Sequence, residues 1–367
     1  ISLASIALLA VTAGAAPHAP ALDPPAVLQT HESPSESQRF AASAAGAQVE
    51  WTLHRSADGA HPNADEQSML WLMNRARRDP TSEGVFLASV DDGDVQSALG
   101  YFDVNLGVLM QEFAAIEAQP PAAFDARLHA AAYEHSLYLI ANDAQNHNGQ
   151  FDRVETAGFH AWGMRGNVFS YADSALYGHA GFNVDWGGSD GTGMQAGRGH
   201  RLAIMSIDGD YTNVGLAAVP ETNPATRVGP LVVTGNYAYA ATSYADHYNR
   251  FLVGTVWEDL DGNARYDPGE GIAGVDVVPS TGPYFAVTGA AGGYAIPLPG
   301  TVAAGPVAVS FSGGGVPSHT AVLELGAASE LVDYAVTEEL VPEPDAVATG
   351  TIAMLALALL RKKIIRG

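Results

Sequence analysis

Side chains that carry oxygen recur at alternate positions between Asp259 and Glu270. With Asp259 counted as position 1, they occupy positions 1, 3, 5, 9 and 12 of a calcium loop, and a backbone carbonyl falls at position 7. Calcium requires several oxygen ligands around one point, and alternate residues of a tightly wound loop can supply them. We therefore predict a calcium site with the ligands Asp259, Asp261, Asn263, the Arg265 carbonyl, Asp267 and Glu270.

The sequence around this loop indicates strands rather than helices. An apolar run at 251–257 leads into the loop, and further strand-like runs follow between Gly/Pro turns at 274–278, 284–288, 292–297 and 307–311. The glycine that calcium loops usually carry at position 6 is replaced by Ala264, while Gly262 stands at position 4. We expect a small β-sandwich that carries a calcium loop, and the alternative is a solvated acidic turn.

Residues 249–340 resemble the SdrD B-type and carboxypeptidase-regulatory-like repeats of surface proteins, because of these strand runs and the D-x-D-x-N loop. The resemblance implies calcium with a structural role, bound with a dissociation constant on the order of 10⁻⁴ to 10⁻³ M, as in extracellular modules. It also implies a rigid β-domain that holds the rest of the chain away from a membrane.

The composition narrows the classes of partner. The chain has 17 Lys+Arg against 40 Asp+Glu, which gives a formal net charge of -23. Such a chain is a poor partner for nucleic acid and favours cations, calcium among them. It contains no cysteine, which excludes disulfides, thiolate catalysis and cysteine-ligated zinc. Any metal must therefore be bound by histidines, carboxylates and carbonyls.

The two ends of the chain are typical of export and sorting segments. Residues 1–16 are apolar and finish in small residues, as in a signal peptide, and we expect the printed chain to begin inside that peptide. An apolar run at 346–360, of marginal spanning length, is followed by basic residues within 361–366. The residues shortly before this run are Pro342, Glu343 and Pro344.

This order of motif, apolar run and basic end resembles the PEP-CTERM sorting signal of Gram-negative bacteria. The resemblance covers residues 341–367 and implies an exosortase-like sorting enzyme as partner, with cleavage beside the motif. Before processing, the segment would act as a transmembrane anchor. We expect export to the cell surface or the extracellular space, and a plain tail anchor is the alternative.

The main domain is predicted at residues 63–248, after a linker at 17–62 that is rich in Pro, Ala and Ser and is expected to be disordered. Apolar residues recur at helical spacing in three stretches, and two later runs are strand-like. The predicted helices are 63–79, 106–116 and 125–142, and the predicted strands are 214–219 and 231–234.

Short motifs follow one another in this domain in a definite order. They are Asn74-Arg75-Ala76-Arg77, Ala132-Tyr133-Glu134-His135, Asn146-His147-Asn148-Gly149, Gly166-Asn167-Val168, Gly199-His200-Arg201 and Val214-Gly215-Leu216. Their order resembles the bacterial branch of the CAP superfamily, which has the SCP domain of cysteine-rich secretory, antigen 5 and pathogenesis-related proteins. The resemblance implies an α/β fold, a CAP-type α/β/α three-layer sandwich, followed here by the small all-β sandwich domain.

The resemblance also implies a cleft lined by two histidines and two acidic residues, which binds a divalent metal in some members. His147 and His200 match the histidine positions. Gly166 stands where family members commonly carry the first acid, and the helix before Trp186 offers His179 but no carboxylate for the second. One hypothesis is a zinc site of His147, His179 and His200 with room for water. The alternative is that these histidines bond loop carbonyls and fix the shape of the cleft.

Other polar residues near this cleft have less specific patterns. His135 lies on the apolar face of the helix at 125–142 and is predicted to be a core histidine with a hydrogen-bond partner. Four aspartates after the helix that precedes Trp186 could offer oxygen ligands, although acidic loops in such a chain are usually solvated. They are Asp185, Asp190, Asp208 and Asp210.

Three functions remain open from the sequence. The leading hypothesis is a binding protein whose CAP-type cleft holds a small apolar ligand, an envelope ligand or a partner, since the loss of both cleft acids removes candidates for general acid and base. The second is a metal-dependent hydrolase that uses the cleft histidines to activate water. The third is a structural component of the matrix or biofilm, in contact with extracellular polymer.

Overall fold

The structure is a computed structural model that describes residues 26–28, 47–188 and 190–336. One compact unit extends to Ala335. The predicted signal peptide at 1–16 and sorting signal at 341–367, with Pro342, Glu343 and Pro344, lie outside the described residues. No helix in the described part of the chain is long and apolar enough to cross a membrane.

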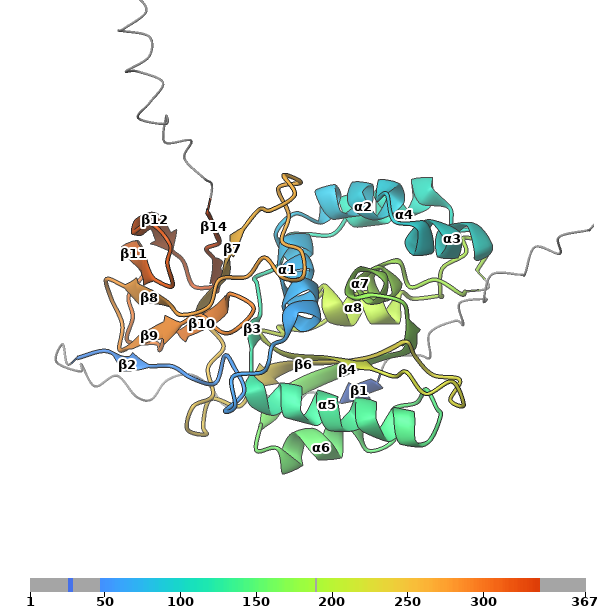
Figure 1. The fold of residues 1–367 in the computed structure, drawn as a ribbon, viewed down its shortest axis with the longest axis horizontal. Coiled ribbons are helices and arrows are strands. Elements are labelled where there is room, and N and C mark those ends of the chain that lie inside the picture. The colour runs from blue at the N-terminus through green and yellow to red at the C-terminus, as the bar shows by residue number, and fades with distance from the viewer. Residues whose placement is uncertain (1–25, 29–46, 189, 337–367) are drawn as a thin grey trace, which may run out of the picture. The chain divides into compact units, whose positions relative to one another are not determined.

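A five-stranded sheet forms the centre of the first half of this unit (Figure 1). Its spatial order is β1 (Ala26–Leu28), β4 (Ala161–Ala172), β6 (Leu231–Ala240), β5 (Asn213–Pro220) and β3 (Ala123–Phe124). Neighbouring strands are antiparallel, except that β3 and β5 run parallel. The strands predicted at 214–219 and 231–234 correspond to β5 and the first part of β6.

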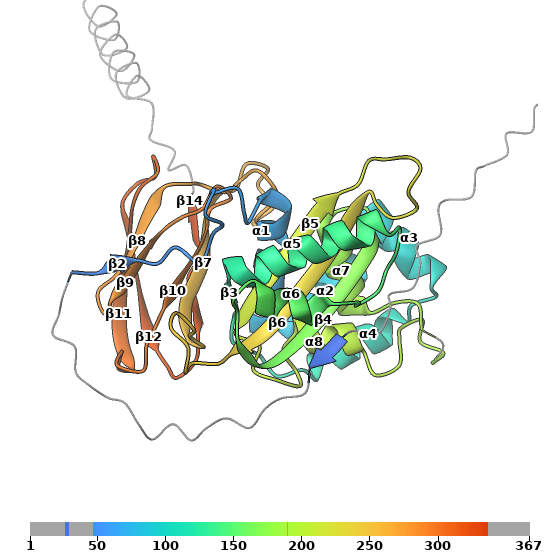
Figure 2. The same ribbon diagram turned by 90° about the horizontal axis from the view of Figure 1, so that it is seen from below.

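Helices cover both faces of this sheet, as Figures 1 and 2 show. On one face lie α5 (Ala126–Ala141) and α6 (Gln150–Thr156). The helices on the opposite side are α1 (Ala64–Arg78), α2 (Pro80–Ser89), α3 (Gly93–Tyr101), α4 (Leu106–Ala114), α7 (Ala175–Val184) and α8 (Gly199–Ile204). The largest apolar cluster fills the space between these helices and the sheet.

All three predicted helices are present, and each starts at a capping residue that can be recognised from the local sequence. The side chain of Asn63 accepts the Glu66 N–H, and the Glu66 carboxylate accepts the Asn63 N–H, which closes a capping box at the start of α1. Asn105 and Asp125 cap α4 and α5 in the same way through single side-chain bonds. Each of these helices begins within one residue of its predicted start.

The second half of the unit consists of strands in two further sheets. The sheet order β10-β7-β13, with β14 also paired to β7, uses β7 (Phe251–Glu258), β10 (Gly293–Pro297), β13 (Glu330–Leu331) and β14 (Tyr334–Val336). The order β12-β11-β8-β9-β2 uses β2 (Val49–Glu50), β8 (Val275–Pro279), β9 (Tyr284–Val287), β11 (Gly305–Gly313) and β12 (His319–Leu325). The predicted α/β class is confirmed at this level, with helices and several mixed sheets.

The last part of the predicted linker at 17–62 has a defined conformation, which corrects that prediction for residues 47–62. Strand β2 pairs with β9, and Trp51 is buried with its ring edge-on to Tyr248 and Tyr284. His54 is buried as well, and its two ring nitrogens lie 2.8 and 2.9 Å from the carbonyl oxygens of Trp51 and Val287. This stretch lacks apolar periodicity because it is held by single anchoring side chains and not by an amphipathic face.

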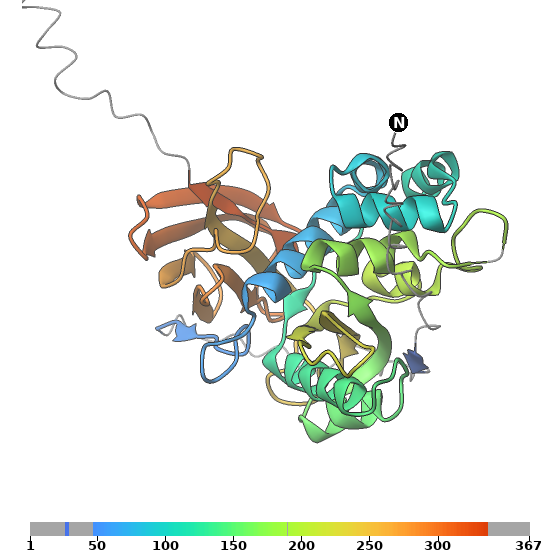
Figure 3. The ribbon, with the colours of Figure 1, turned by 45° about the vertical axis from the view of Figure 1, so that its right-hand side comes forward.

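Helix α1 also lies along the strands of the second half (Figure 3). Trp71 and Leu72 of this helix form one apolar cluster with Trp257 and Tyr266. Gln67 donates a hydrogen bond of 2.8 Å to the hydroxyl of Thr255 on β7. The helical part and the strand part therefore share a packed interface.

Candidate functional site

The predicted calcium loop follows β7 and closes on itself at its base. The Glu258 N–H bonds the Glu270 carbonyl at 3.0 Å, and Trp257 forms an isolated bridge with Gly271. Inside the loop, the Asp259 carboxylate accepts the backbone N–H groups of Gly262, Asn263 and Ala264 at 2.8 to 3.1 Å. These three bonds wind the chain around the first carboxylate, as a loop that surrounds an ion requires.

Ala264 adopts the conformation that a glycine usually supplies at this point of a calcium loop. Its φ is 59°, in the left-handed region that favours glycine, and Gly262 has φ 77°. Alanine costs about 1 kcal/mol in that region relative to glycine, an amount that the closed hydrogen bonds of the loop can offset. The departure from the usual sequence therefore does not prevent the loop from winding.

The carboxylates of Asp259, Asp261 and Glu270 bring oxygen atoms within 4.8 Å of one another. Glu270 is 6 % exposed, and its two oxygens accept the N–H groups of Leu260 and Asp267, each at 2.8 Å. Three of the predicted ligands thus converge. With no cation between them, these three carboxylates would repel one another at close range.

The remaining predicted ligands adjoin this group. Asn263 donates its amide hydrogens to Asp261 and Asp267, at 2.9 and 2.5 Å, and its carbonyl oxygen accepts the Arg265 N–H. The Asn263 side chain would have to turn to offer its oxygen to a cation. The guanidinium of Arg265 points out of the loop and lies 5.0 Å from the ring centre of Phe86 on α2.

The three histidines predicted to share a zinc ion are not brought together. Each has its own partner: His147 Nδ1 bonds Gln150 at 2.7 Å, His179 bonds Glu83 at 2.9 Å, and His200 bonds Asp185 at 2.7 Å. Among the described residues, His147, His179 and His200 form no group whose ligand atoms lie within 4.8 Å of one another. The structure therefore corrects the prediction of a three-histidine site.

The central sheet separates two of these histidines. Gly166 and Asn167 are adjacent on β4, so their side-chain positions face opposite sides of the sheet. Gln150, the partner of His147, lies against Gly166, within 2.5 Å of where a Cβ would stand. Asn167 reaches the carbonyl of His200 in α8 from the other face, at 3.0 Å.

Asp185 is a partner of His200 that sequence reasoning did not assign. It follows α7 directly with φ 59°, and this left-handed turn points its carboxylate at His200. One oxygen accepts the ring Nδ1–H at 2.7 Å and the other accepts the His200 backbone N–H at 3.0 Å. Both side chains are fully buried, so the pair is closed to a substrate. The sequence signal that could have suggested this pair was an aspartate at the end of a helix, 15 residues before the histidine.

His135 behaves as predicted for a core histidine. It is fully buried on α5 and its Nε2 bonds the carbonyl of Asn146 at 2.9 Å. Burial lowers the pKa of His135 to about 4. The hydrogen bond to the Asn146 carbonyl acts to raise this pKa, but its effect is smaller. The ring is therefore neutral at physiological pH and fixes the loop that carries His147.

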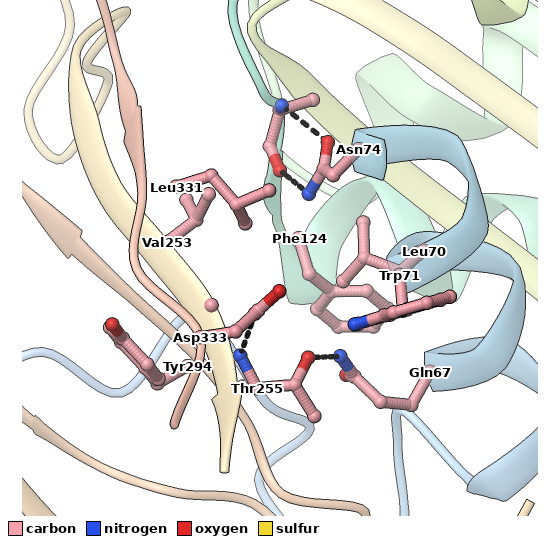
Figure 4. Close-up of a pocket in the computed structure, with 12 residues that line it drawn as sticks. Gln67, Leu70, Trp71, Asn74, Phe124, Val253, Thr255, Tyr294, Leu331 and Asp333 are labelled. Carbon is pink, nitrogen blue, oxygen red and sulfur yellow. Dashed lines mark hydrogen bonds between the residues drawn. The ribbon is translucent and has the colours of Figure 1, made fainter. Parts of the chain in front are cut away.

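A small cavity lies between α1 and β7 (Figure 4). Its polar lining includes Gln67, Thr255 and the buried carboxyl of Asp333, which accepts the Thr255 N–H at 2.8 Å. Burial raises the pKa of Asp333 to about 6, although this bond opposes the shift. The cavity measures about 10 Å³, which suffices for one water molecule and not for an apolar ligand.

A scan of the chain against protein-family models finds no match, and neither does a search of curated proteins.

Proposed function

We propose that this protein is an exported binding protein with two modules: a CAP-type α/β/α module that carries the binding surface, and a β-module stabilised by calcium. The observation that supports this most directly is the calcium loop. Its carboxylates of Asp259, Asp261 and Glu270 gather within 4.8 Å at the end of β7. Calcium would neutralise this charge and replace the internal hydrogen bonds of the loop by metal–oxygen contacts.

The layer order and the short sequence motifs support the CAP-type part of the proposal. Helices lie on both faces of a sheet in which β4, β6 and β5 pair antiparallel, and two of the motifs, at 166–168 and 214–216, lie on β4 and β5. The position of the first acid of the CAP cleft is Gly166, and the amide of Gln150 fills the space beside it. An amide cannot act as a general acid or base at ordinary pH, which favours binding over catalysis at this position.

The ligand is proposed to bind on the outer surface of the CAP-type module, and the cavity between α1 and β7 is too small to hold it. An envelope polymer or a surface partner suits such a site better than a small enclosed molecule. The proposed location, outside the cell, agrees with the calcium loop. Loops of this kind in extracellular modules bind with constants on the order of 10⁻⁴ to 10⁻³ M, so they are filled only where calcium is abundant.

Calcium titration of the full chain by calorimetry, paired with thermal unfolding, tests the proposal. Wild type should bind one calcium ion at this loop and gain stability, by about 2.7 kcal/mol at a calcium concentration of 100 times the dissociation constant. Asp259→Asn and Glu270→Gln should weaken binding at least tenfold, since each removes a charged ligand from the cluster.

Asp276→Asn serves as the matched control, because Asp276 is exposed on β8 outside the loop. It should bind calcium as wild type does. Equal binding by wild type and both loop variants, or no stabilisation of wild type by calcium, would contradict the proposal.

A further inference from the structure

A second group of metal-ligating side chains lies away from the calcium loop and from the cleft histidines. It consists of His61, just before α1, Glu66, in the first turn of α1, and His129, on α5. Within the part of the chain that the structure describes, two groups of three such residues bring ligand atoms within 4.8 Å, and only this one contains imidazoles.

The carboxylate of Glu66 lies between the two rings. One oxygen is 2.7 Å from His61 Nδ1, and the other is 2.9 Å from His129 Nε2. The rings lie side by side, with their centres 4.4 Å apart. Two imidazoles and one carboxylate from two segments, residues 61–66 and α5, therefore point at one small volume.

The backbone fixes the carboxylate in this position. The Asn63 N–H of the capping box bonds one oxygen at 2.8 Å, and the Ala218 N–H on β5 approaches the other at 3.3 Å. The Glu66 side chain is fully buried, whereas 4 % of the His129 side chain and 23 % of the His61 side chain are exposed. The site is thus rigid at its base and open to solvent on the side of His61.

The group carries a buried negative charge. Its carboxylate oxygens face four donors, namely two backbone N–H groups and two imidazole nitrogens. A proton on one imidazole or a bound cation can balance this charge.

We propose that His61 Nδ1, the Glu66 carboxylate and His129 Nε2 form a binding site for a divalent ion of the zinc class. Two histidines and one glutamate make up a ligand set that binds zinc with its fourth position open, and solvent at His61 would fill that position. Both rings can present a lone pair by adopting the other neutral tautomer.

The geometry requires only a modest adjustment. Ligand atoms around a tetrahedral zinc lie about 3.4 Å apart. The ligand atoms of this group already lie within 4.8 Å of one another. His61 can move most easily because it is half-buried and precedes α1. Other histidine–acid pairs lack a third ligand: His179 with Glu83 and His200 with Asp185 each join one imidazole to one carboxylate.

The test uses the full chain, freed of metal by a chelator and kept in saturating calcium so that the calcium loop is occupied. Zn²⁺ is titrated by calorimetry, and Co²⁺ absorption reports whether the ion is held in a tetrahedral nitrogen and oxygen environment. Wild type should bind one equivalent of either ion. His61→Ala and Glu66→Gln should each weaken Zn²⁺ binding by at least about tenfold, because each removes a direct ligand.

The control is His160→Ala, because His160 pairs with Glu155 at 3.2 Å but belongs to neither of the two three-ligand groups found among the described residues. It should bind Zn²⁺ as wild type does. Should Glu66→Gln fail to fold, the half-exposed His61→Ala and the Co²⁺ spectrum decide. The proposal is overturned if wild type binds no stoichiometric Zn²⁺, if His61→Ala binds as wild type does, or if binding is lost in His147→Ala but kept in His61→Ala.

Discussion

At Gly166 the absence of a side chain lets Gln150 connect two layers of the molecule. The Gln150 amide accepts the ring N–H of His147 and donates to Asn236 on β6 at 2.8 Å. A methyl group at position 166 would stand 2.5 Å from this amide. Because Gln150 is buried and bonded on both sides, it cannot move aside without breaking these bonds.

We therefore expect Gly166→Ala to destabilise the protein by about 1 to 2 kcal/mol through loss of the Gln150 hydrogen bonds. Gln150→Ala should cost a similar amount. The double variant should cost less than the sum by at least about 0.5 kcal/mol, because the two changes remove the same bonds. Urea unfolding at pH 7 measures all three differences.

Gly100→Ala is the control for glycine replacement, since Gly100 lies in α3 with no atom within 4 Å of its Cβ position. It should be neutral or slightly stabilising. Strict additivity of Gly166→Ala and Gln150→Ala would show that the close approach at Gly166 does not act through Gln150.

Asp333 gives a second prediction at this scale, on pH. Its pKa is about 6 in the folded protein against an ordinary 3.8, so the folded state holds this proton more tightly than the unfolded state. Its contribution to stability is therefore present below about pH 4 and is lost as pH rises through 6. Asp333→Asn keeps an acceptor for Thr255 and should be more stable than wild type at pH 7, by on the order of 3 kcal/mol.

The measurement is chemical unfolding of wild type and Asp333→Asn between pH 4 and pH 8. The difference between them should shrink toward zero near pH 4. Asp276→Asn, an exposed aspartate on the same module, should follow the wild-type curve at every pH. A difference for Asp333→Asn that does not change with pH would rule out titration of this carboxyl as its cause.

Single residues were predictable where their partners are close in sequence. The oxygen ligands of the proposed calcium loop lie in one short stretch of sequence, so their spacing alone predicted that Asp259, Asp261 and Glu270 come together. His129 and Glu66 are separated by 63 positions and meet only because α1 and α5 pack near β5. No local pattern could pair them.

The same distinction holds for whole elements. Helix α1 begins at a capping box and has a regular apolar face, and both signals are local. Strand β4 was not predicted, because Gly163, Arg165 and Gly166 interrupt its apolar alternation. Its residues are nonetheless mostly buried, since helices cover both faces of the sheet. A strand that is buried on both faces does not need alternating apolar and polar residues, and strand prediction depends on that alternation.

The segment at 47–62 shows how an element without periodicity is ordered. It joins the two halves of the unit: Trp51 contacts Tyr248 and Tyr284, and the Ala126 N–H of α5 bonds the Leu53 carbonyl. Its composition predicted disorder because the anchors are few and far apart. These anchors could not be predicted from the segment itself, because partners such as Tyr248 and Tyr284 lie far away in the sequence.

On the scale of the whole described unit, the proposed calcium loop is also part of the interface between the helical and strand parts. Tyr266, inside the loop, is buried against Trp257 and joins the cluster with Trp71 of α1. Arg265 stacks on Phe86 of α2 at 5.0 Å. An ion that fixes the loop would therefore also fix the surface on which α1 and α2 rest.

This arrangement predicts that calcium stabilises helices to which it does not bind. Calcium should slow hydrogen exchange at α1 and α2 amides of wild type, because the loop can then open less often. Phe86→Ala removes the ring under Arg265 and leaves the ligands intact, so it should keep calcium affinity within about twofold while losing most of that protection. Val85→Ala, on the same helix but 51 % exposed, should behave as wild type. Undiminished protection in Phe86→Ala would mean that calcium reaches these helices through the contacts of α1 with β7 and not through Phe86. No protection in wild type would mean that calcium acts on the loop alone.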